Sequence, residues 1–237
     1  MNLQNPKKFQ MLLDQAHETA LNVLRPISRK YDKAEHAYPK ELDMLASLLD
    51  GMNDGGDGMN AGAAVNKRGD TDSSNKNGVN MSTALGVIEM CYGDTGLLLS
   101  MPRQGLGNSA IAAVANDEQL ERFKGTWAAM AITEPGCGSD SAAIRTTATK
   151  DGDDYILNGE KIFVTSGERA DAVVVWATLD KKVGRAAIKS FVVAKGTAGM
   201  KVERLEHKLG IKASDTAVIS FTDCRVPAAN LLGNPEI

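Results

Sequence analysis

The strongest constraint on the fold is a change of hydrophobic period near Gly125. Before this residue, apolar side chains recur at the spacing of amphipathic helices, and after it they alternate with polar ones as in half-buried strands. The strands do not alternate with helices and none precedes a GxGxxG motif, which argues against a doubly wound dinucleotide-binding sheet. We therefore predict an α+β protein, with an all-α domain at residues 1–125 and a small β-barrel or sandwich domain at residues 126–237.

The helical half contains several apolar stripes and one polar interruption. We expect Pro26 to kink or restart the first helix, and Asn116 or Asp117 to cap the last one, which stops at Gly125. Residues 51–80 are dense in Gly, Asn and Asp, which indicates a long loop, either an active-site lid or a solvated insertion. The predicted helices are residues 7–31, 37–51, 81–101, 105–115 and 116–125.

The second half shows short valine-rich and threonine-rich runs separated by turn residues. An Asp-Gly pair at Asp151–Gly152 lies between two alternating segments and predicts a hairpin over residues 145–167. The other predicted strands are residues 127–134, 171–179, 189–195, 200–207 and 216–227.

Composition excludes several classes of function. Charge is nearly balanced, with 27 Lys+Arg against 30 Asp+Glu, which argues against nucleic-acid binding. Three scattered cysteines predict neither a disulfide framework nor a zinc site. His17, His36 and His207 lie far apart in the sequence, so we expect no metal centre. Without an apolar run of about 18 residues or a secretory signal, we expect a cytoplasmic protein with no membrane span.

The stretch AITEPGCGSD, residues 131–140, places a polar turn directly after an apolar strand. Gly136 and Gly138 permit positive φ and close approach of a ligand to the backbone, and exposed N–H groups in such a turn can bind an anion. Thr133 and Ser139 add a hydroxyl at each end, and Pro135 stiffens the bend. Alone, the pattern is typical of an ordinary surface turn, because most Gly-Ser turns bind no ligand.

A second stretch, GEKIFVTSG at residues 159–167, suits a flat heteroaromatic ligand. Phe163 and Thr165 are two residues apart in a predicted strand, which places them on the same face. The ring could cover one face of a ligand while the hydroxyl meets a ring nitrogen. On its own, Phe163 is typical of an ordinary core residue.

Together these stretches resemble the acyl-CoA dehydrogenase family of flavoproteins. The resemblance rests on ITEPGCGSD, on LNGEKIFVTSG and on HKLGIKASDTAVISFTDCRVPAANLLG, in that order, and RPISRKYDKAEHAYPKELDMLA is similar to the family's N-terminal helices. It covers most of the chain apart from residues 51–80. It implies the family's N-terminal helical and middle β domains, without its C-terminal four-helix bundle.

The resemblance also implies an FAD site. The backbone from Met130 to Thr133 would border the flavin ring, with the Thr133 hydroxyl on its pyrimidine side, and Ser139 would lie near the pyrophosphate and the acyl-CoA substrate. Phe163, at a position often occupied by Trp in the family, would shield one flavin face, and Thr165 would meet the N5 edge. The implied cofactor-binding residues are Met130, Ala131, Ile132, Thr133, Gly138, Ser139, Phe163, Val164 and Thr165.

The implied reaction is the introduction of an α,β double bond into an acyl-CoA thioester, as in fatty-acid β-oxidation. Electron-transfer flavoprotein is the implied acceptor, and a homotetramer or homodimer the implied assembly. In the family the four-helix bundle supplies the catalytic base, so we expect that base beyond Ile237 and assign no catalytic residue in this chain. The alternatives are a flavin oxidase or monooxygenase on the same scaffold, and a non-catalytic subunit that pairs with an active homologue.

Overall fold

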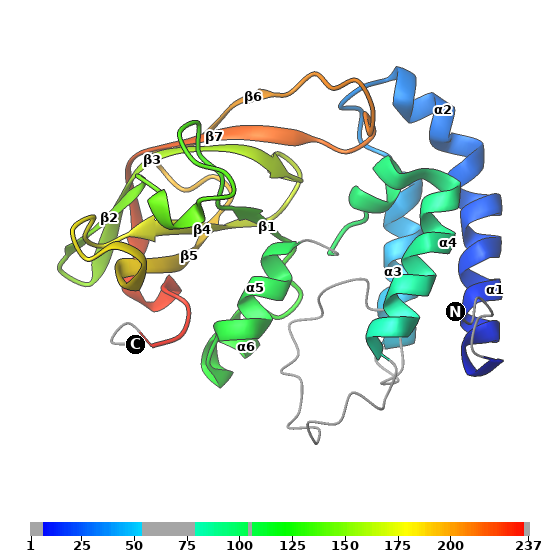
Figure 1. The fold of residues 1–237 in the computed structure, drawn as a ribbon, viewed down its shortest axis with the longest axis horizontal. Helices are drawn as coiled ribbons and strands as arrows, with labels where there is room; N and C mark the ends of the chain where they lie inside the picture. The colour runs from blue at the N-terminus through cyan, green and yellow to red at the C-terminus, as the bar shows by residue number, and fades with distance from the viewer. Residues whose placement is uncertain (1–6, 54–78, 104–105, 235–237) are drawn as a thin grey trace. The chain divides into compact units, whose positions relative to one another are not determined.

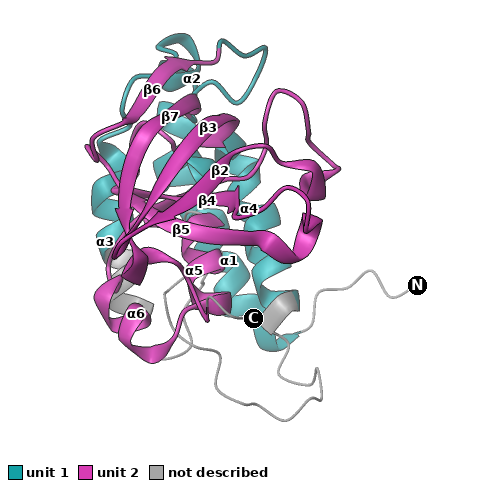
Figure 2. Ribbon diagram, turned by 90° about the vertical axis from the view of Figure 1, so that its left-hand side faces the viewer, with its two compact units in different colours: residues 1–61, 68–102, 207–214 teal, residues 62–67, 103–206, 215–237 magenta. Residues whose placement is uncertain are grey.

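The computed structural model describes residues 7–53, 79–103 and 106–234. Among these residues, the chain up to Pro102 together with His207–Ser214 forms one compact unit, and Arg103–Glu206 with the chain from Asp215 onward forms the other (Figure 2). The division lies before the helices of residues 106–122, whereas the domain boundary inferred from periodicity lies near Gly125. A compact unit is defined by contacts and not by independent folding, so that domain boundary stays a prediction.

The first unit begins with a helical run that changes type ahead of a proline. A short 3₁₀ turn, Lys7–Phe9, leads into α1, Gln10–Thr19, then a π-helical stretch, Ala20–Leu24, then α2, Arg25–Lys33. Pro26 has no N–H, and its ring conflicts with the carbonyl four residues back. The wider π turn lies where that conflict would arise, and α2 restarts with Pro26 in its first turn, as the sequence predicts.

Two further helices lie in the described part of this unit (Figure 1). α3, Glu41–Asn53, runs past Gly51, and α4, Val79–Leu99, is interrupted where Asp94 adopts an extended conformation. The Asp94 carboxylate accepts the Leu97 N–H at 2.8 Å and so caps the last turn of α4. Residues 54–78, which make up most of the loop predicted at 51–80, lie outside the described part of the chain. The ends of that prediction are helical, because α3 extends to Asn53 and α4 begins at Val79. No helix in the described ranges has the length and apolarity needed to cross a membrane.

Close packing of α4 on the π-helical stretch fixes the core of the first unit. A Cβ added to Gly93 would lie 2.7 Å from the Ala20 carbonyl oxygen, so only glycine fits there. The fully buried Ala16, Leu24, Leu42 and Leu97 pack together in this core.

In the second unit, two short helices precede the sheet. α5 is Leu106–Val114, and α6, Asp117–Arg122, starts with a capping box between Asn116 and Gln119. Asn116 is therefore the N-cap, as one of the two sequence-based choices had it, and Gly125 follows the helix at a φ of 76°. The capping box fixes the start of α6 ahead of the first strand.

The β region is a single seven-stranded sheet that curls on itself (Figure 1). Its order is β1-β4-β2-β3-β7-β6, with β5 on the other side of β4, and β4 pairs in parallel with β1 and β2. This confirms the predicted α+β class. The strands are β1 Ala128–Ala131, β2 Thr147–Asp151, β3 Asp154–Thr165, β4 Ala172–Thr178, β5 Ile188–Ala194, β6 Met200–Leu205 and β7 Thr216–Pro227.

β3 begins at the predicted hairpin and contains a bulge farther along. The predicted hairpin is present, with Asp151 paired to Asp154 and Gly152 at a φ of 59° in the turn. Farther along, the pairing of β3 with β7 shifts register between Lys161 and Val164, which marks a β-bulge. The bulge lies within the second motif identified in the sequence.

Candidate functional site

The two sequence motifs meet where β1 ends. The Ile162 N–H donates to the Thr133 carbonyl oxygen at 2.9 Å, so the segment after β1 lies against the bulge of β3. A β-bulge leaves main-chain groups outside the regular ladder and redirects side chains. The motifs, far apart in the sequence, therefore share one local structure.

A buried ion pair joins the same two segments. The Lys161 ammonium lies 2.7 Å from Glu134 Oε1, and their side chains are 0% and 5% exposed. Lys161 also donates to the Ile132 carbonyl oxygen at 2.9 Å. The other acceptor positions of Glu134 take the main-chain N–H groups of Arg145, at 2.6 Å, and Thr146, at 3.0 Å. The carboxylate is thus occupied on both oxygens, in keeping with a structural role.

The protonation states follow from these contacts. Burial alone would raise the pKa of Glu134, but the donors from Lys161, Thr146 and Arg145 outweigh it and hold that pKa below its usual value. Burial lowers the pKa of Lys161, and the facing Glu134 carboxylate partly offsets that effect. Glu134 is therefore ionised at neutral pH and committed to its partners.

The turn after Glu134 is closed by a pair of main-chain hydrogen bonds between Glu134 and Cys137, at 3.0 and 3.1 Å. Gly136 and Gly138 would permit positive φ, but neither adopts it in the structure. Among the described residues, nothing lies within 4 Å of a Cβ added at either position. No contact within the described chain demands glycine here, which leaves the turn open to close approach by a ligand.

The exposed end of this turn opens into a pocket of about 490 Å³. Its wall contains Ile132 and Ser139, two of the residues singled out in the sequence, and the indole of Trp176. The guanidinium of Arg185 and the Ser139 hydroxyl are donors suited to phosphate or carbonyl oxygens. The remaining lining residues are Asp140, Ser141, Ala142 and Ile188.

Phe163 presents an aromatic ring to solvent from the bulge. Its side chain is 61% exposed, whereas the next residue, Val164, is wholly buried and Thr165 is half-buried. Phe163 has a φ of 58°, a conformation that a bulky residue adopts only at a cost. An exposed aromatic ring held in a strained conformation is suited to covering the face of a flat ligand.

The other sequence-predicted residues surround this point. Met130 is half-buried and Ala131 fully buried in β1, while Ile132 and Thr133 are half-buried just beyond its end. Gly138 is exposed in the turn. The Ile162–Thr133 hydrogen bond brings the first four of these residues next to the Phe163 segment, and Ser139 lies at the pocket.

Sequence reasoning missed two buried charged residues. Lys161 was not singled out, although it has the same strand parity as the buried Tyr155 and Leu157, and a lysine at an inward position needs a partner. Asp215 was also missed. Its main chain accepts the Ser166 N–H at 3.1 Å and its carboxylate accepts the Glu168 N–H at 2.9 Å, so it anchors the turn after Thr165.

Comparison with known proteins identifies the scaffold. A model for the middle domain of acyl-CoA dehydrogenases matches residues 129–224. The mitochondrial short-chain specific acyl-CoA dehydrogenase of Rattus norvegicus is 32% identical over 97% of this chain and 54% of its own length. The chain belongs to the acyl-CoA dehydrogenase family. The match to the rat enzyme extends this family assignment beyond the middle domain into the N-terminal helices.

Solved structures support the same assignment for this acyl-CoA dehydrogenase family member. Butyryl-CoA dehydrogenase from Megasphaera elsdenii superposes with a TM-score of 0.78 at 29% identity, over 99% of this chain and 60% of that one. Acryloyl-CoA reductase (NADH) from Anaerotignum propionicum is 42% identical over 132 residues, which are 52% of this chain and 34% of that protein. The chain spans about half the length of the curated mammalian relatives it matches.

Proteins of the acyl-CoA dehydrogenase family are FAD-dependent. The residues of this chain fit that cofactor, because the segment with the exposed Phe163 ring and the segment with the open glycine turn are joined at the end of β1. Thr133 and Thr165 on these segments add hydroxyl groups.

Proposed function

We propose that the protein is an FAD-dependent acyl-CoA dehydrogenase, or the part of one, that introduces an α,β double bond into an acyl-CoA thioester. The hydrogen bond from Ile162 to the Thr133 carbonyl carries this proposal, because it joins the two motifs into one wall beside the exposed Phe163. FAD supplies the acceptor for the hydride that leaves the substrate's β-carbon. The residues of this chain bind and orient the reactants.

Each residue has a proposed task. The Phe163 ring covers one face of the flavin and keeps water from it, and the hydroxyls of Thr133 and Thr165 bond to polar atoms at its edges. The Lys161–Glu134 pair holds the main chain at Ile132 in place, so that these groups meet the cofactor in a fixed geometry.

The pocket at the end of the glycine turn is the proposed site for polar parts of the cofactor and the acyl-CoA. Ser139 offers a hydroxyl and Arg185 a cation to phosphate or carbonyl oxygens, beside the apolar Trp176 and Ile188. Several relatives are short-chain specific acyl-CoA dehydrogenases, which makes butyryl-CoA a suitable first substrate.

The base that removes the α-proton is proposed to lie beyond Ile237 or in another chain. Glu134 is unsuitable, because both of its oxygens already accept hydrogen bonds from buried donors. Electron-transfer flavoprotein is the proposed electron acceptor, and one solved structure that is 32% identical, with a TM-score of 0.79, is named for the electron transferring flavoprotein of Acidaminococcus fermentans. We also propose that the protein forms a homotetramer or homodimer, is cytoplasmic and takes part in β-oxidation.

The test uses the protein with the complete coding sequence. We expect it to purify yellow, and the visible flavin absorption to bleach when butyryl-CoA is added without oxygen. An artificial electron acceptor should then restore the absorption over repeated turnovers. A folded protein that carries no flavin, or flavin that acyl-CoA thioesters leave oxidised, would contradict the proposal.

A flavin oxidase is the second candidate, and one observation favours it. The prolyl acyl carrier protein oxidase AnaB superposes with a TM-score of 0.77 at 26% identity over 98% of this chain. The two functions differ in the fate of the electrons, because an oxidase passes them to oxygen. Rapid formation of hydrogen peroxide during turnover in air would favour the oxidase.

A further inference from the structure

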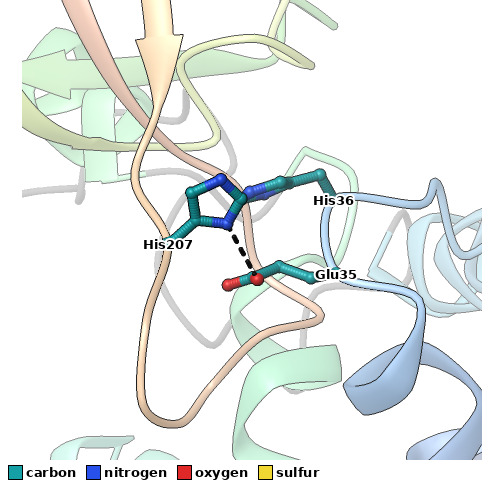
Figure 3. Close-up of side chains that lie close together, drawn as sticks. All are labelled: Glu35, His36 and His207. Carbon is teal, nitrogen blue, oxygen red and sulfur yellow. Dashed lines mark hydrogen bonds and ion pairs between the residues drawn. The ribbon is translucent and has the colours of Figure 1, made fainter.

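Three side chains that can bind metals converge in the first compact unit. Glu35 and His36 follow the end of α2, and His207 opens the segment His207–Ser214 that follows β6 (Figure 3). Two of the three histidines in the chain therefore lie together, although 171 positions separate them. Their separation in the sequence therefore does not keep these two histidines apart in the fold.

The geometry is already close to that of a coordination sphere. Glu35 Oε2 and His207 Nδ1 are 3.1 Å apart, and the rings of His36 and His207 have centroids 5.3 Å apart at an angle of 55°. One ligand atom from each of the three residues lies within 4.8 Å of the others. Zinc bonds of about 2.0–2.2 Å separate two ligand atoms on the same ion by roughly 3.3 Å. The Glu35–His207 pair already has this spacing.

Glu35 is prepared as a ligand. Its Oε1 accepts the main-chain N–H of Lys208 at 2.9 Å, which leaves Oε2 facing the His207 imidazole. A carboxylate ligand whose other oxygen accepts such a hydrogen bond is oriented before the ion arrives.

We propose that Glu35, His36 and His207 form a binding site for Zn²⁺. Two imidazoles and one carboxylate are a ligand set for zinc and its first-row neighbours, whereas Mg²⁺ and Ca²⁺ prefer all-oxygen sites. The His207 side chain is 85% exposed, so its ring can make the small adjustment that closes the site. Water fills the remaining coordination position.

The bound ion would tie the segment His207–Ser214 to the end of α2. The far end of this segment is already fixed, because Ser100 Oγ donates to the Ala213 carbonyl oxygen at 2.9 Å. The near end is held by the Lys208–Glu35 hydrogen bond. Because zinc would bind the folded protein and not the unfolded chain, the melting temperature should rise with the zinc concentration.

The experiment is a calorimetric titration of the chelator-treated full chain with ZnCl₂, with MgCl₂ as the comparison ion. We expect one Zn²⁺ per chain and no binding of Mg²⁺. Loss of a residue that only hydrogen-bonds to a metal ligand weakens metal binding about 10–100-fold. Loss of a ligand itself should therefore weaken zinc binding at least about tenfold in each of the variants His36→Gln, His207→Gln and Glu35→Gln. Circular dichroism checks that each variant is folded.

The matched control is His17→Gln. His17 also has a carboxylate neighbour, Glu89 at 2.8 Å, but the described residues bring no third ligand to it. This variant should bind zinc like the parent. The proposal is overturned if folded parent protein binds no zinc, or if His36→Gln and His207→Gln bind it as tightly as the parent does.

Cobalt gives an independent readout, because the chain also contains three free cysteines. A Co²⁺ adduct of this site should show visible ligand-field bands without a thiolate charge-transfer band, and His207→Gln should abolish them. A thiolate band that persists in His207→Gln would place the ion on a cysteine and overturn the assignment.

Discussion

Lys161 Nζ lies 2.7 Å from Glu134 Oε1, and neither side chain is more than 5% exposed. The pair links the turn after β1 to the bulge of β3, and the same ammonium reaches the Ile132 carbonyl oxygen. The two motifs that form the wall of the proposed flavin site are thus held together by one buried charge pair. Its loss should affect both folding and cofactor binding.

Glu134→Gln should destabilise the protein by about 3–5 kcal/mol, because it leaves the buried Lys161 charge without its counter-ion. The measurement is urea unfolding followed by circular dichroism. The control is Glu160→Gln on the exposed side of β3, which should change stability by no more than about 0.5 kcal/mol. Equal effects of the two variants would contradict a buried ion pair.

Replacing both partners separates stability from positioning. A Glu134→Gln, Lys161→Met double variant should recover part of the stability lost in Glu134→Gln, since it removes the unpaired buried charge while the side-chain carbonyl oxygen of the introduced glutamine still accepts a main-chain N–H. The Ile132 carbonyl would still lack its donor, so FAD affinity should stay below that of the parent. Full recovery of both properties would show that the pair does not position the site.

Acid should destabilise the helical unit through Glu41. Hydrogen bonds from Lys30 and Tyr31 lower the pKa of Glu41 to about 2, from an ordinary value of 4.5. The ionised carboxylate therefore adds stability above about pH 4.5, and that contribution is lost as the pH falls towards 2. Glu41→Gln should flatten the dependence of unfolding free energy on pH in this window. Parallel curves for parent and Glu41→Gln would refute the linkage.

Phe163 should matter for FAD more than for folding. Its positive φ means that Phe163→Gly relieves strain that Phe163→Ala retains, so the glycine variant should be the more stable by about 1 kcal/mol. Both variants should weaken FAD binding, by about 1–3 kcal/mol if the ring stacks as aromatic side chains do on bases. Comparing unfolding curves with flavin titrations tests this. A glycine variant less stable than the alanine variant would contradict a strained Phe163.

Substitution of two glycines by alanine should affect different properties of the protein. A Cβ at Gly107 would lie 2.2 Å from the Ala129 carbonyl oxygen, so Gly107→Ala should displace α5 from β1 and cost at least about 1–3 kcal/mol. Gly138→Ala has open space around it and should leave stability unchanged, while it lowers FAD affinity by blocking the turn. Unchanged flavin affinity in Gly138→Ala would remove Gly138 from the site.

Local patterns predicted most of the secondary structure. The Asp-Gly turn and the alternation of apolar with polar residues are short-range signals. The hairpin at Gly152 follows from the first signal, and the strand Thr216–Pro227 follows from the second. The capping box at Asn116 is equally local. The kink at Asp94 is not, because it depends on how α4 packs and on the hydrogen bonds that the carboxylate finds.

The site was only partly predictable for the same reason. Its motifs were visible as sequence, but the bulge at Phe163 arises from a register shift against β7, which depends on a distant strand. The buried Lys161 looked like an ordinary charged strand residue, although its parity pointed inward. The meeting of His36 with His207 depends on tertiary structure alone.

The most direct test of the flavin site is a titration of flavin-free protein with FAD, followed by quenching of flavin fluorescence. We expect saturable binding of one FAD per chain, weakened at least about fivefold in Phe163→Ala. Val183→Ala, which shortens another exposed apolar side chain, should match the parent. Folded protein that binds no FAD, or equal affinities for parent and Phe163→Ala, would contradict the assignment of this wall to the cofactor.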